Sequence, residues 1–301
     1  MKKSVKVQSP ATSANMGPGF DCLGMALDIW NSVEVTVGDN GVEISGEGHD
    51  SLPKGPSNLV HQSVVRVFEE LGWNIPDFKL SCHNEIPLTR GLGSSSASLV
   101  GGLMAGNELC DGAFADDELL QIASEIEGHP DNVAPALYGG FRIAVNHNGR
   151  IISAPVPIPD GLAAVLFIPD VPMLTEEARG ILPPEIQRAD AVYNIGRAAM
   201  LVRAFASGDL ALLDVATGDM LHQPARQTIF PAMKNMFRAA MAVGALGVFL
   251  SGAGSTVLAL AQEKEFTIGY EMADAAAKSG IEGQVKITKP VSQGTHVVHS
   301  V

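Results

Sequence analysis

The sequence predicts a mixed α+β fold. Apolar and polar residues alternate at 31–37 and 78–84, as in strands, while 58–71 carries apolar residues at helical spacing. The strands and helices do not follow one another in regular βαβ order, which favours α+β over a doubly wound parallel sheet. The chain has 301 residues, 46% of them hydrophobic and 18% charged, enough for two domains or for one elaborated domain.

The first half of the chain contains most of the predicted strands. They are expected at 3–9, 31–37, 42–46, 78–84, 141–146 and 151–155. Residues 9–28 are rich in small residues and glycine, so we expect a loop with a short turn there. Helices are expected at 58–71, where Gly72 stops the pattern, at Ser95–Leu109, and at 116–127, whose Asp-rich start suits the helix dipole.

A proline-rich segment, PVPIPDG at 155–161, is the best candidate for an interdomain linker. It divides the chain into an N-terminal domain of residues 1–158 and a C-terminal domain of residues 159–301. The sequence AAVLFIP directly after it is predicted to be a buried strand. The remaining helices are expected near 175–182, 188–206, 209–220, 231–242 and 265–279, and the remaining strands within 247–261 and at 284–288.

The net charge of −13 argues against two classes of partner. Nucleic acids and anionic membranes are bound by clustered lysine and arginine, and the sequence has no dense basic run. The cysteines, Cys22, Cys82 and Cys110, are widely spaced, which suits a reducing compartment and argues against a disulfide framework or a zinc site. The sequence shows no signal peptide and no run long enough to span a bilayer, so we expect a cytoplasmic protein.

The segment PLTRGLGSSSAS at 87–98 carries the strongest chemical signal. Gly91 and Gly93 let the backbone approach a phosphate, and the serines that follow open a helix whose N-terminal N–H groups attract anions. The segment lacks the lysine of the common P-loop. A turn with a serine N-cap explains the same residues, so the segment alone leaves a phosphate site and a simple helix start both open.

Three further segments concentrate polar residues among small ones. Asn15 and Asp21 lie in PATSANMGPGFDCLGMAL, as in a pocket wall, and Glu127 and His129 belong to EGHPDN. The third segment is LSGAGSTVLAL at 250–260, a glycine turn between apolar strands. Each has a purely structural explanation as well, namely a loop with Asx turns, a helix cap and a tight hairpin.

Taken together and in this order, the four motifs resemble those of the GHMP kinases, and the resemblance spans nearly the whole chain. It implies phosphorylation of a small alcohol by ATP with Mg²⁺. It also implies an N-terminal domain like one in a ribosomal protein, with a left-handed βαβ crossover, and a ferredoxin-like C-terminal domain. Such a crossover departs from the usual right-handed rule, and nothing in the pattern of strands and helices predicts it.

The resemblance assigns the nucleotide and Mg²⁺ to particular residues. Ser95 and Glu127 would bind Mg²⁺, a hard cation that prefers oxygen ligands. Ser96 stands where the family usually has alanine, so neighbouring serines remain alternatives for this role. The residues implied to bind ATP are Ser57, Asn58, Leu59, Pro87, Arg90, Gly91, Leu92, Gly93, Ser94, Ser95 and Ser96.

The segments PATSANMGPGFDCLGMAL, EGHPDNVAP, TEEARGILP and HQPAR resemble the members of this family that phosphorylate L-homoserine. A site for this zwitterion needs cations for the carboxylate and an acceptor for the ammonium. Arg179 and Arg226 match the two arginines that the family uses, and guanidinium groups bind carboxylates bidentately. Asp21 fits the ammonium, and further polar contacts are implied for Asn15, His129 and Thr175.

The implied reaction is direct in-line transfer of the γ-phosphoryl group to homoserine, in threonine biosynthesis, by an enzyme expected to be a homodimer. Position 132 is asparagine, which cannot accept a proton at neutral pH, so no dedicated base is expected. The residues implied to act in catalysis are Ser95, Glu127, Asn132 and Arg179. Two alternatives remain: a kinase for another alcohol, such as mevalonate or shikimate, and a non-catalytic relative that senses a nucleotide or metabolite.

Overall fold

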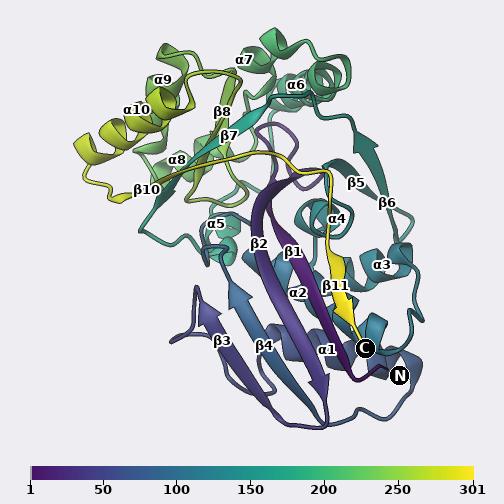
Figure 1. The fold of residues 1–301 in the computed structure, drawn as a ribbon. Helices are drawn as coiled ribbons and strands as arrows, with labels where there is room; N and C mark the ends of the chain where they lie inside the picture. Colours follow the sequence, from purple (N-terminus) through teal and green to yellow (C-terminus); the bar gives the residue numbers. More distant parts are fainter. Residues whose placement is uncertain (1) are drawn as a thin grey trace.

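Two β-sheets organise the chain, which the computed structural model describes over residues 2–301. Figure 1 shows the first sheet in the lower half of the molecule and the second in the upper half. Strands and helices alternate irregularly along the chain, which confirms the α+β class predicted from the sequence. None of the helices within residues 2–301 has the length and apolar character needed to span a membrane.

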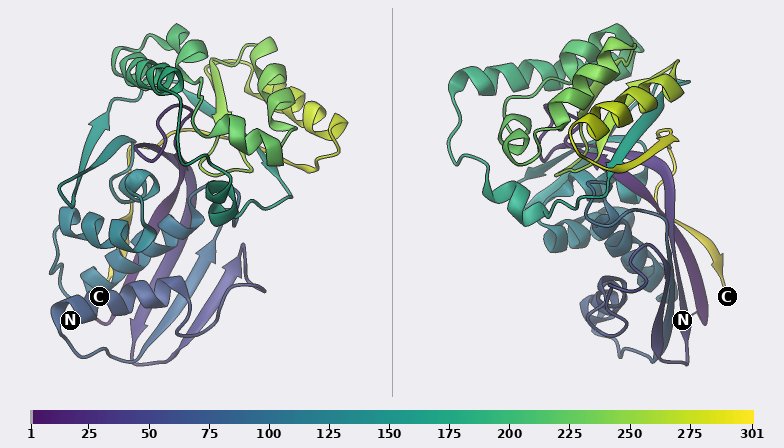
Figure 2. Two further views of the ribbon diagram at one scale, coloured as in Figure 1. Left: turned by 180° about the vertical axis from the view of Figure 1, so that it is seen from behind. Right: turned by 90° about the vertical axis from the view of Figure 1, so that its left-hand side faces the viewer.

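The first sheet has seven strands and carries its helices on one face (Figure 2). Its strand order is β11-β1-β2-β4-β3, and β5 pairs with both β2 and β6. The strands are β1 (Ser4–Ala14), β2 (Leu23–Val37), β3 (Gly41–Gly46), β4 (Phe78–Asn84), β5 (Phe141–His147), β6 (Arg150–Val156) and β11 (His296–Ser300). The helices are α1 (Leu59–Leu71), α2 (Ser94–Leu109), α3 (Asp116–Glu127) and α4 (Pro130–Tyr138).

Strands β1 and β2 are much longer than predicted. The expected loop over 9–28 is wrong, because β1 continues to Ala14 and β2 already starts at Leu23. The two strands pair as far as Ala14 and Gly24, with a bulge after Pro10. This stretch is buried on both faces, so its small residues show no alternation that could reveal a strand.

Strands β3 and β4 are parallel neighbours joined through α1. In Figure 1 both strands point upward, β3 lies to the left of β4, and α1 passes behind the sheet. A connection that runs from left to right behind upward-pointing strands is left-handed, which is rare for parallel strands. The structure therefore contains the crossover that the family resemblance implies.

The second sheet has four strands in the order β10-β7-β9-β8, and all neighbours are antiparallel. Helical connections join β7 to β8 and β9 to β10, which is the ferredoxin-like arrangement that the resemblance implies. The strands are β7 (Ala163–Pro169), β8 (Gly247–Leu250), β9 (Val257–Ala261) and β10 (Gly283–Thr288). The helices are α5 (Thr175–Gly180), α6 (Arg188–Ser207), η1 (Leu210–Leu212, a 3₁₀ turn), α7 (Leu213–Ala216), α8 (Gln223–Ile229), α9 (Met233–Ala242) and α10 (Glu265–Lys278).

The helix predicted over 209–220 is wrong, because this stretch forms only η1 and the short α7. The chain then turns and enters α8, which the sequence does not predict. Asp219 starts this helix by accepting a hydrogen bond from the N–H of Gln223 at 2.7 Å, and Pro224 occupies the first turn, where no N–H is needed. The turn between α7 and α8 matters for the site because α8 carries Arg226.

Strand β11 lies beyond the last strand predicted from the sequence. It pairs antiparallel with β1, so that Val5 faces Ser300 and Gln8 faces His296. Residues 296–300 therefore belong to the first sheet by hydrogen bonding, although the sequence predicts them in the C-terminal domain. The predicted boundary between 158 and 159 falls between β6 and β7, and the division into two domains stays a prediction.

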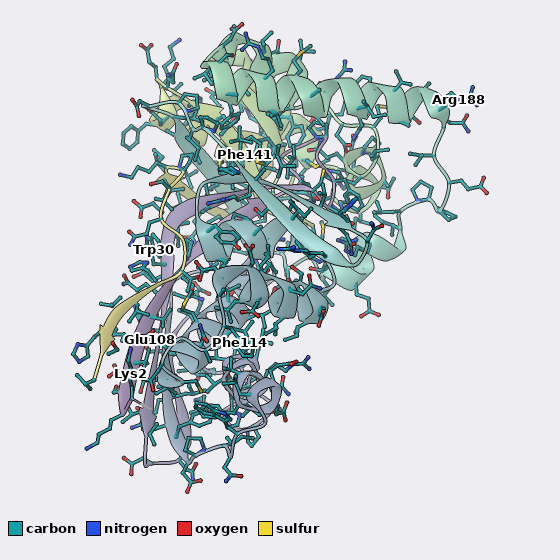
Figure 3. All side chains as sticks on the ribbon, turned by 90° about the vertical axis from the view of Figure 1, so that its right-hand side faces the viewer. Lys2, Trp30, Glu108, Phe114, Phe141 and Arg188 are labelled. Atoms are coloured by element: carbon teal, nitrogen blue, oxygen red, sulfur yellow. The ribbon has the colours of Figure 1, made fainter. Side chains whose placement is uncertain are left out.

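One hydrophobic cluster joins the two sheets. Phe141 of β5 and Phe205 of α6 meet edge to face, with ring centroids 4.8 Å apart. Phe141, labelled in Figure 3, lies at the junction of the two halves of the molecule. Leu23 of β2 and Phe249 of β8 belong to the same cluster. This shared core packs the sheets against each other, so side chains from both halves can form one site.

Candidate active site

A cavity of about 420 Å³ lies between the helices of the first sheet and the loops of the second. Its wall is formed by the loop before α2, the end of α3, the start of the loop between β1 and β2, and residues of α5 and α8. All the site residues predicted from the sequence line it except Asp21 and Ser96, and these two contact lining residues. The structure thus brings the predicted set together from segments far apart in the chain, while their individual roles stay predictions.

The loop before α2 brings a helix N-terminus to the cavity. Gly93 is the N-cap, with φ of 67°, and no side chain caps the first turn. The serine N-cap considered above is therefore absent here, because Ser94 is already the first helical residue. A Cβ atom at Gly93 would lie 1.9 Å from Oγ1 of Thr12, so glycine allows this close approach. The unpaired N–H groups and the positive end of the helix dipole suit an anionic phosphate.

Two serine hydroxyls converge on one carboxylate beside this helix start. Ser95 Oγ donates to Oε1 of Glu127 at 3.0 Å, and Ser96 Oγ donates to the same oxygen at 2.9 Å. Glu127 is the last residue of α3, where the helix dipole disfavours a carboxylate. Hydroxyl and carboxylate oxygens are the ligands that Mg²⁺ prefers, so these residues fit the predicted metal. Both serines remain candidate ligands.

The guanidinium group of Arg90 is held by backbone carbonyl groups. Its Nε donates to the carbonyl of Pro169 at 2.6 Å and its Nη2 to the carbonyl of Asp170 at 2.5 Å, while Nη1 donates to Leu88 at 3.0 Å. These contacts tie the loop before α2 to the end of β7. The Arg90 side chain therefore links the two halves of the molecule, and its contact with ATP stays a prediction.

The end of the cavity next to α1 is apolar and suits a flat aromatic base. The Asn58 side chain, predicted to bind ATP, is occupied by helix capping. It accepts a hydrogen bond from the N–H of Val60 at 2.9 Å and donates to the carbonyl of Pro53 at 2.9 Å. Asn58 therefore fixes the start of α1 at the cavity. The apolar lining residues at this end are Ile44, Leu52, Leu59, Val60, Cys82 and Leu88.

Asp21 and Arg179, predicted to bind opposite ends of an amino acid, bind each other in this structure. Arg179 Nη2 donates to Oδ1 of Asp21 at 2.5 Å, and Nη1 donates to Oδ2 at 3.1 Å. The hydrogen bond that Arg179 donates to Asp21 outweighs partial burial and raises the pKa of Arg179. A zwitterionic ligand offers both residues a new partner at once, a carboxylate for the guanidinium and an ammonium for the carboxylate.

Arg226 is the largest of the fully buried side chains, at 1% exposure. Burial first, and then the charge of Arg179, lowers its pKa to about 10, so it remains protonated at neutral pH. Nη1 donates to the carbonyl of Gly252 and to Nδ1 of His222, both at 2.9 Å, and Nε donates to Ala178 at 3.3 Å. Its Nη2 donates to no acceptor among residues 2–301, and Arg226 lines the cavity. One edge of the guanidinium group is thus left for an anion.

The residues after α3 are held by short-range hydrogen bonds. Nδ1 of His129 lies 2.9 Å from Oδ1 of Asp131. Burial alone would lower the pKa of His129, but the hydrogen bond and the charge of Asp131 outweigh it, so the pKa is raised. Oδ1 of Asn132 accepts a hydrogen bond from Oγ1 of Thr12 at 2.7 Å. Thr175, the first residue of α5, also lines this cavity.

Asn15 organises the loop between β1 and β2. Its Nδ2 donates to the carbonyl of Gly252 at 3.0 Å, and its Oδ1 accepts from the N–H of Asp21 at 3.0 Å. Both Asn15 and Asp21 adopt positive φ, which asparagine and aspartate tolerate better than most residues. The loop is therefore fixed to the β8–β9 turn, and Asp21 is presented toward Arg179.

Three parts of the site were not found from the sequence. The family resemblance implied Leu59 at the apolar end of the cavity, but Ile44, Leu52 and Leu88 gave no signal because they come from three separate segments. Thr12 was hidden in a stretch of small residues. His222 was within reach, because the HQPAR segment was singled out for Arg226 and contains His222 one helical turn earlier.

The sequence of the chain is similar to proteins of known family. A family model described as GHMP kinases N terminal domain matches residues 58–140, and one described as GHMP kinases C terminal matches residues 201–277. Homoserine kinase from Desulfitobacterium hafniense is 42% identical over 296 residues, which cover 98% of this chain and 100% of that protein. Homoserine kinase from Moorella thermoacetica is 40% identical, with 97% of this chain and 99% of that protein covered.

The fold is similar to solved structures as well. The crystal structure of homoserine kinase from Cytophaga hutchinsonii matches with a TM-score of 0.89 and 34% sequence identity, covering 99% of this chain and 98% of that one. The structure of L. major mevalonate kinase matches with a TM-score of 0.71 and 16% identity, covering 96% of this chain and 99% of that one. At that identity the second match shows a shared fold alone.

Proposed function

Since the chain belongs to the GHMP kinase family, we propose that it transfers the γ-phosphoryl group of ATP to the hydroxyl group of L-homoserine, forming O-phospho-L-homoserine and ADP. One observation carries the choice of acceptor: the cavity that contains a helix N-terminus for phosphate is also lined by Arg226 and by Arg179, which is paired with Asp21. A phosphorylated product and an amino-acid acceptor require these two kinds of group in one cavity. The names of the relatives support the same acceptor.

We assign the nucleotide to the part of the cavity between α1 and α2. The apolar end takes the base, and the turn from Gly91 to Ser96 takes the phosphates through its N–H groups. Ser95 and Glu127 would hold Mg²⁺, with Ser96 as the alternative hydroxyl. When bound there, Mg²⁺ would neutralise charge on the phosphates as the phosphoryl group transfers.

We assign the acceptor to the opposite wall. Arg226 and Arg179 would bind its carboxylate, and Asp21 would exchange part of its contact with Arg179 for the ammonium group. Asn15, His129 and Thr175 stand around the same space as polar contacts, although the Asn15 amide is already bound at both ends. The acceptor hydroxyl then lies on the side of the phosphates, as in-line transfer requires.

The two polar residues in the first turn of α4 are not free to act as a general base, which fits direct transfer. Asn132 cannot take a proton, and its oxygen is held by Thr12. Asp131 is buried and bound to His129. In a loose transition state the hydroxyl loses its proton late, so positioning and charge neutralisation carry the rate. Arg179 contributes to both, because it faces the acceptor and supplies positive charge.

A coupled assay of ADP release tests this function. With Mg·ATP, we expect turnover with L-homoserine and none above background with mevalonate, galactose or shikimate. Turnover with only an alcohol that is not an amino acid would overturn the acceptor while leaving a kinase. No ADP release with any acceptor, combined with tight ATP binding, would favour the non-catalytic alternative. The predicted homodimer and the predicted cytoplasmic location remain proposals that this assay does not address.

A further inference from the structure

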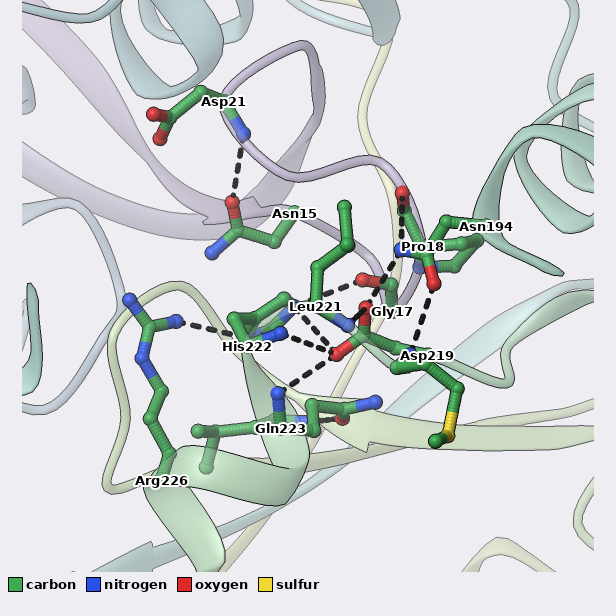
Figure 4. Close-up of polar contacts among 12 residues, drawn as sticks. Asn15, Gly17, Pro18, Asp21, Asn194, Asp219, Leu221, His222, Gln223 and Arg226 are labelled. Atoms are coloured by element: carbon green, nitrogen blue, oxygen red, sulfur yellow. Dashed lines mark hydrogen bonds and ion pairs between the residues drawn. The ribbon is translucent and has the colours of Figure 1, made fainter. Parts of the chain in front are cut away.

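The buried arginine of the acceptor site does not stand alone, because a chain of hydrogen bonds runs behind it (Figure 4). Arg226 Nη1 donates to Nδ1 of His222 at 2.9 Å, and Nε2 of His222 lies 2.8 Å from the carbonyl oxygen of Gly17. His222 is fully buried, with 0% exposure. It lies one helical turn before Arg226, so the start of α8 presents both side chains on the same face.

The partners of His222 define its protonation state. A guanidinium group can only donate, so Nδ1 must carry the lone pair that accepts from Arg226. A carbonyl oxygen can only accept, so Nε2 must carry the proton that goes to Gly17. The imidazole is therefore neutral and in one tautomer. A doubly protonated ring would set an N–H against an N–H of Arg226 and place two cations in contact.

Asp219 holds the backbone around His222 at the start of α8. Its Oδ2 accepts from the N–H groups of His222 at 3.0 Å and Gln223 at 2.7 Å, and its Oδ1 accepts from Leu221 at 2.9 Å. Nδ2 of Asn194 donates to Oδ1 at 2.7 Å. The carboxylate thus has a full set of donors, which suits a buried charge with a structural task.

A phenyl ring covers the other side of the network. Phe20 stacks on His222 with ring centroids 5.4 Å apart. The guanidinium carbons of Arg179 and Arg226 lie 5.4 Å and 5.7 Å from the centre of the same ring. The negative face of an aromatic ring attracts cations, so Phe20 helps to hold two like charges beside one cavity.

We propose that His222, fixed by Asp219 and Gly17, is a positioning residue that holds the guanidinium group of Arg226 toward the carboxylate of the acceptor. This role rests on the proposed function, because it supposes that Arg226 binds that carboxylate. His222 and the carbonyl of Gly252 together occupy both hydrogens of Nη1. The group cannot rotate away, and Nη2 is the donor that remains for the ligand. A preorganised guanidinium loses less freedom when the ligand binds.

Steady-state kinetics of three variants test this role. His222→Leu removes the acceptor for Arg226, so the KM for homoserine should rise roughly 10- to 100-fold, the range for losing a hydrogen bond to a charged group. The KM for ATP should not change. His222→Asn places Oδ1 close to the position of Nδ1, so it should recover part of the homoserine affinity. Arg226→Ala should raise the same KM at least as much as His222→Leu.

A substrate analogue separates positioning from damage to the fold. Aminopropanol has the amino and hydroxyl groups of homoserine but no carboxylate, so kcat/KM for aminopropanol should be the same in His222→Leu and in the unsubstituted protein. Asn107→Leu is the matched control, because it breaks the two hydrogen bonds between the buried Asn107 side chain and the backbone of Phe114, near the C-terminal end of α2. It should lower the melting temperature without raising the KM for homoserine.

The outcomes distinguish the two levels of the proposal. If Arg226→Ala raises the KM for homoserine and His222→Leu does not, the positioning role is overturned and the proposed function stands. If His222→Leu lowers kcat/KM for homoserine and aminopropanol equally, His222 acts on the fold rather than on the carboxylate, and the role is again overturned. If Arg226→Ala leaves the KM for homoserine unchanged, the assignment of the carboxylate under the proposed function fails. If His222→Leu does not fold, a comparison of the KM for homoserine in His222→Asn and in Arg226→Ala decides the same question.

Discussion

At the scale of single residues, two opposing interactions act on the carboxylate of Glu127. The end of α3 disfavours its charge, yet two serine hydroxyls donate to one of its oxygens. A carboxylate kept at a helix C-terminus in a cavity is readily explained by a cation that binds there. Ser95 and Ser96 hold its orientation, so the oxygen is aimed before any cation arrives.

Glu127→Gln tests this explanation at constant side-chain shape. The amide oxygen can still accept from the serines, but the negative charge for Mg²⁺ is lost, so kcat should fall roughly 100-fold or more. Glu125→Gln is the matched control, because it removes the same charge from the same helix at a residue whose carboxylate accepts a hydrogen bond from the exposed side chain of Gln121. Rates measured against Mg²⁺ concentration should shift in the first variant alone. Equal Mg²⁺ dependence in both variants would contradict the metal role.

The neutral state of His222 makes stability depend on pH. Burial, followed by the charge of Arg226, lowers the pKa of His222 from 6.5 to about 4 despite the opposing charges of Asp219 and Asp21. The unfolded state therefore takes up the proton first as the pH falls. The free energy of unfolding is unaffected by this group above about pH 6.5, and it decreases toward pH 4 by up to about 1.4 kcal/mol per pH unit.

Urea unfolding of the unsubstituted protein and of His222→Asn measures this effect. The variant lacks the titrating group, so the stability difference between the two proteins should be smaller at about pH 5 than at about pH 7. Other acidic groups affect both proteins alike and cancel in the comparison. A difference that does not vary with pH would show that His222 titrates normally.

At the scale of elements, the N-terminus of α2 depends on a glycine at its N-cap. Gly93→Ala places a Cβ atom against Thr12, whereas Gly112, with φ of 72°, has no atom within 4 Å of such a Cβ. Both alanines carry the cost of the left-handed region, about 1–2 kcal/mol. Gly112→Ala should lose that stability and keep its activity, while Gly93→Ala should also lose most of its kcat. Thermal unfolding and the ADP assay measure the two effects, and equal activity in both variants would contradict the close packing.

The elements that the sequence predicted are those with a clear period. Helix α1 and strand β4 each have one face toward a core and match the predicted ranges within a residue. Helix α2 is an exception, because it is buried on most sides and was predicted from the glycine and serine residues at its start. The ends of β1 and β2 were missed because they are buried on both sides and built from small residues. Helix α8 was missed because seven residues with a proline show no period.

The residues of the candidate site were also predicted only in part. Glycines, serines and charged residues such as Gly93, Glu127 and Arg179 stand out in a sequence because their chemistry is specific. The apolar end of the cavity consists of residues such as Ile44 and Leu88, which look like any core residue until the chain is folded. The pairing of Asp21 with Arg179 also required the fold, because 158 positions separate the two residues.

At the scale of the whole molecule, the site depends on both sheets. The N-terminus of α2 and Glu127 belong to helices of the first sheet, while Arg179 and Arg226 come from helices of the second. The shared core around Phe141 and Phe205, together with the Arg90 contacts, packs these two walls against each other. With a net charge of −13, the molecule as a whole repels a polyanion, so binding of ATP relies on these local groups.

The pairing of β11 with β1 has a consequence for the connectivity of the chain. Ser4 and Val301 exchange two backbone hydrogen bonds, at 3.1 Å and 3.0 Å, and Figure 1 shows the N and C marks close together. A short flexible linker can therefore join the ends, and new ends can be opened at the exposed turn of Asn148 and Gly149. This circular permutant should keep the melting temperature and the kinase activity, whereas an unfolded permutant would mean that the order of synthesis, and not only the final contacts, is required to reach this fold.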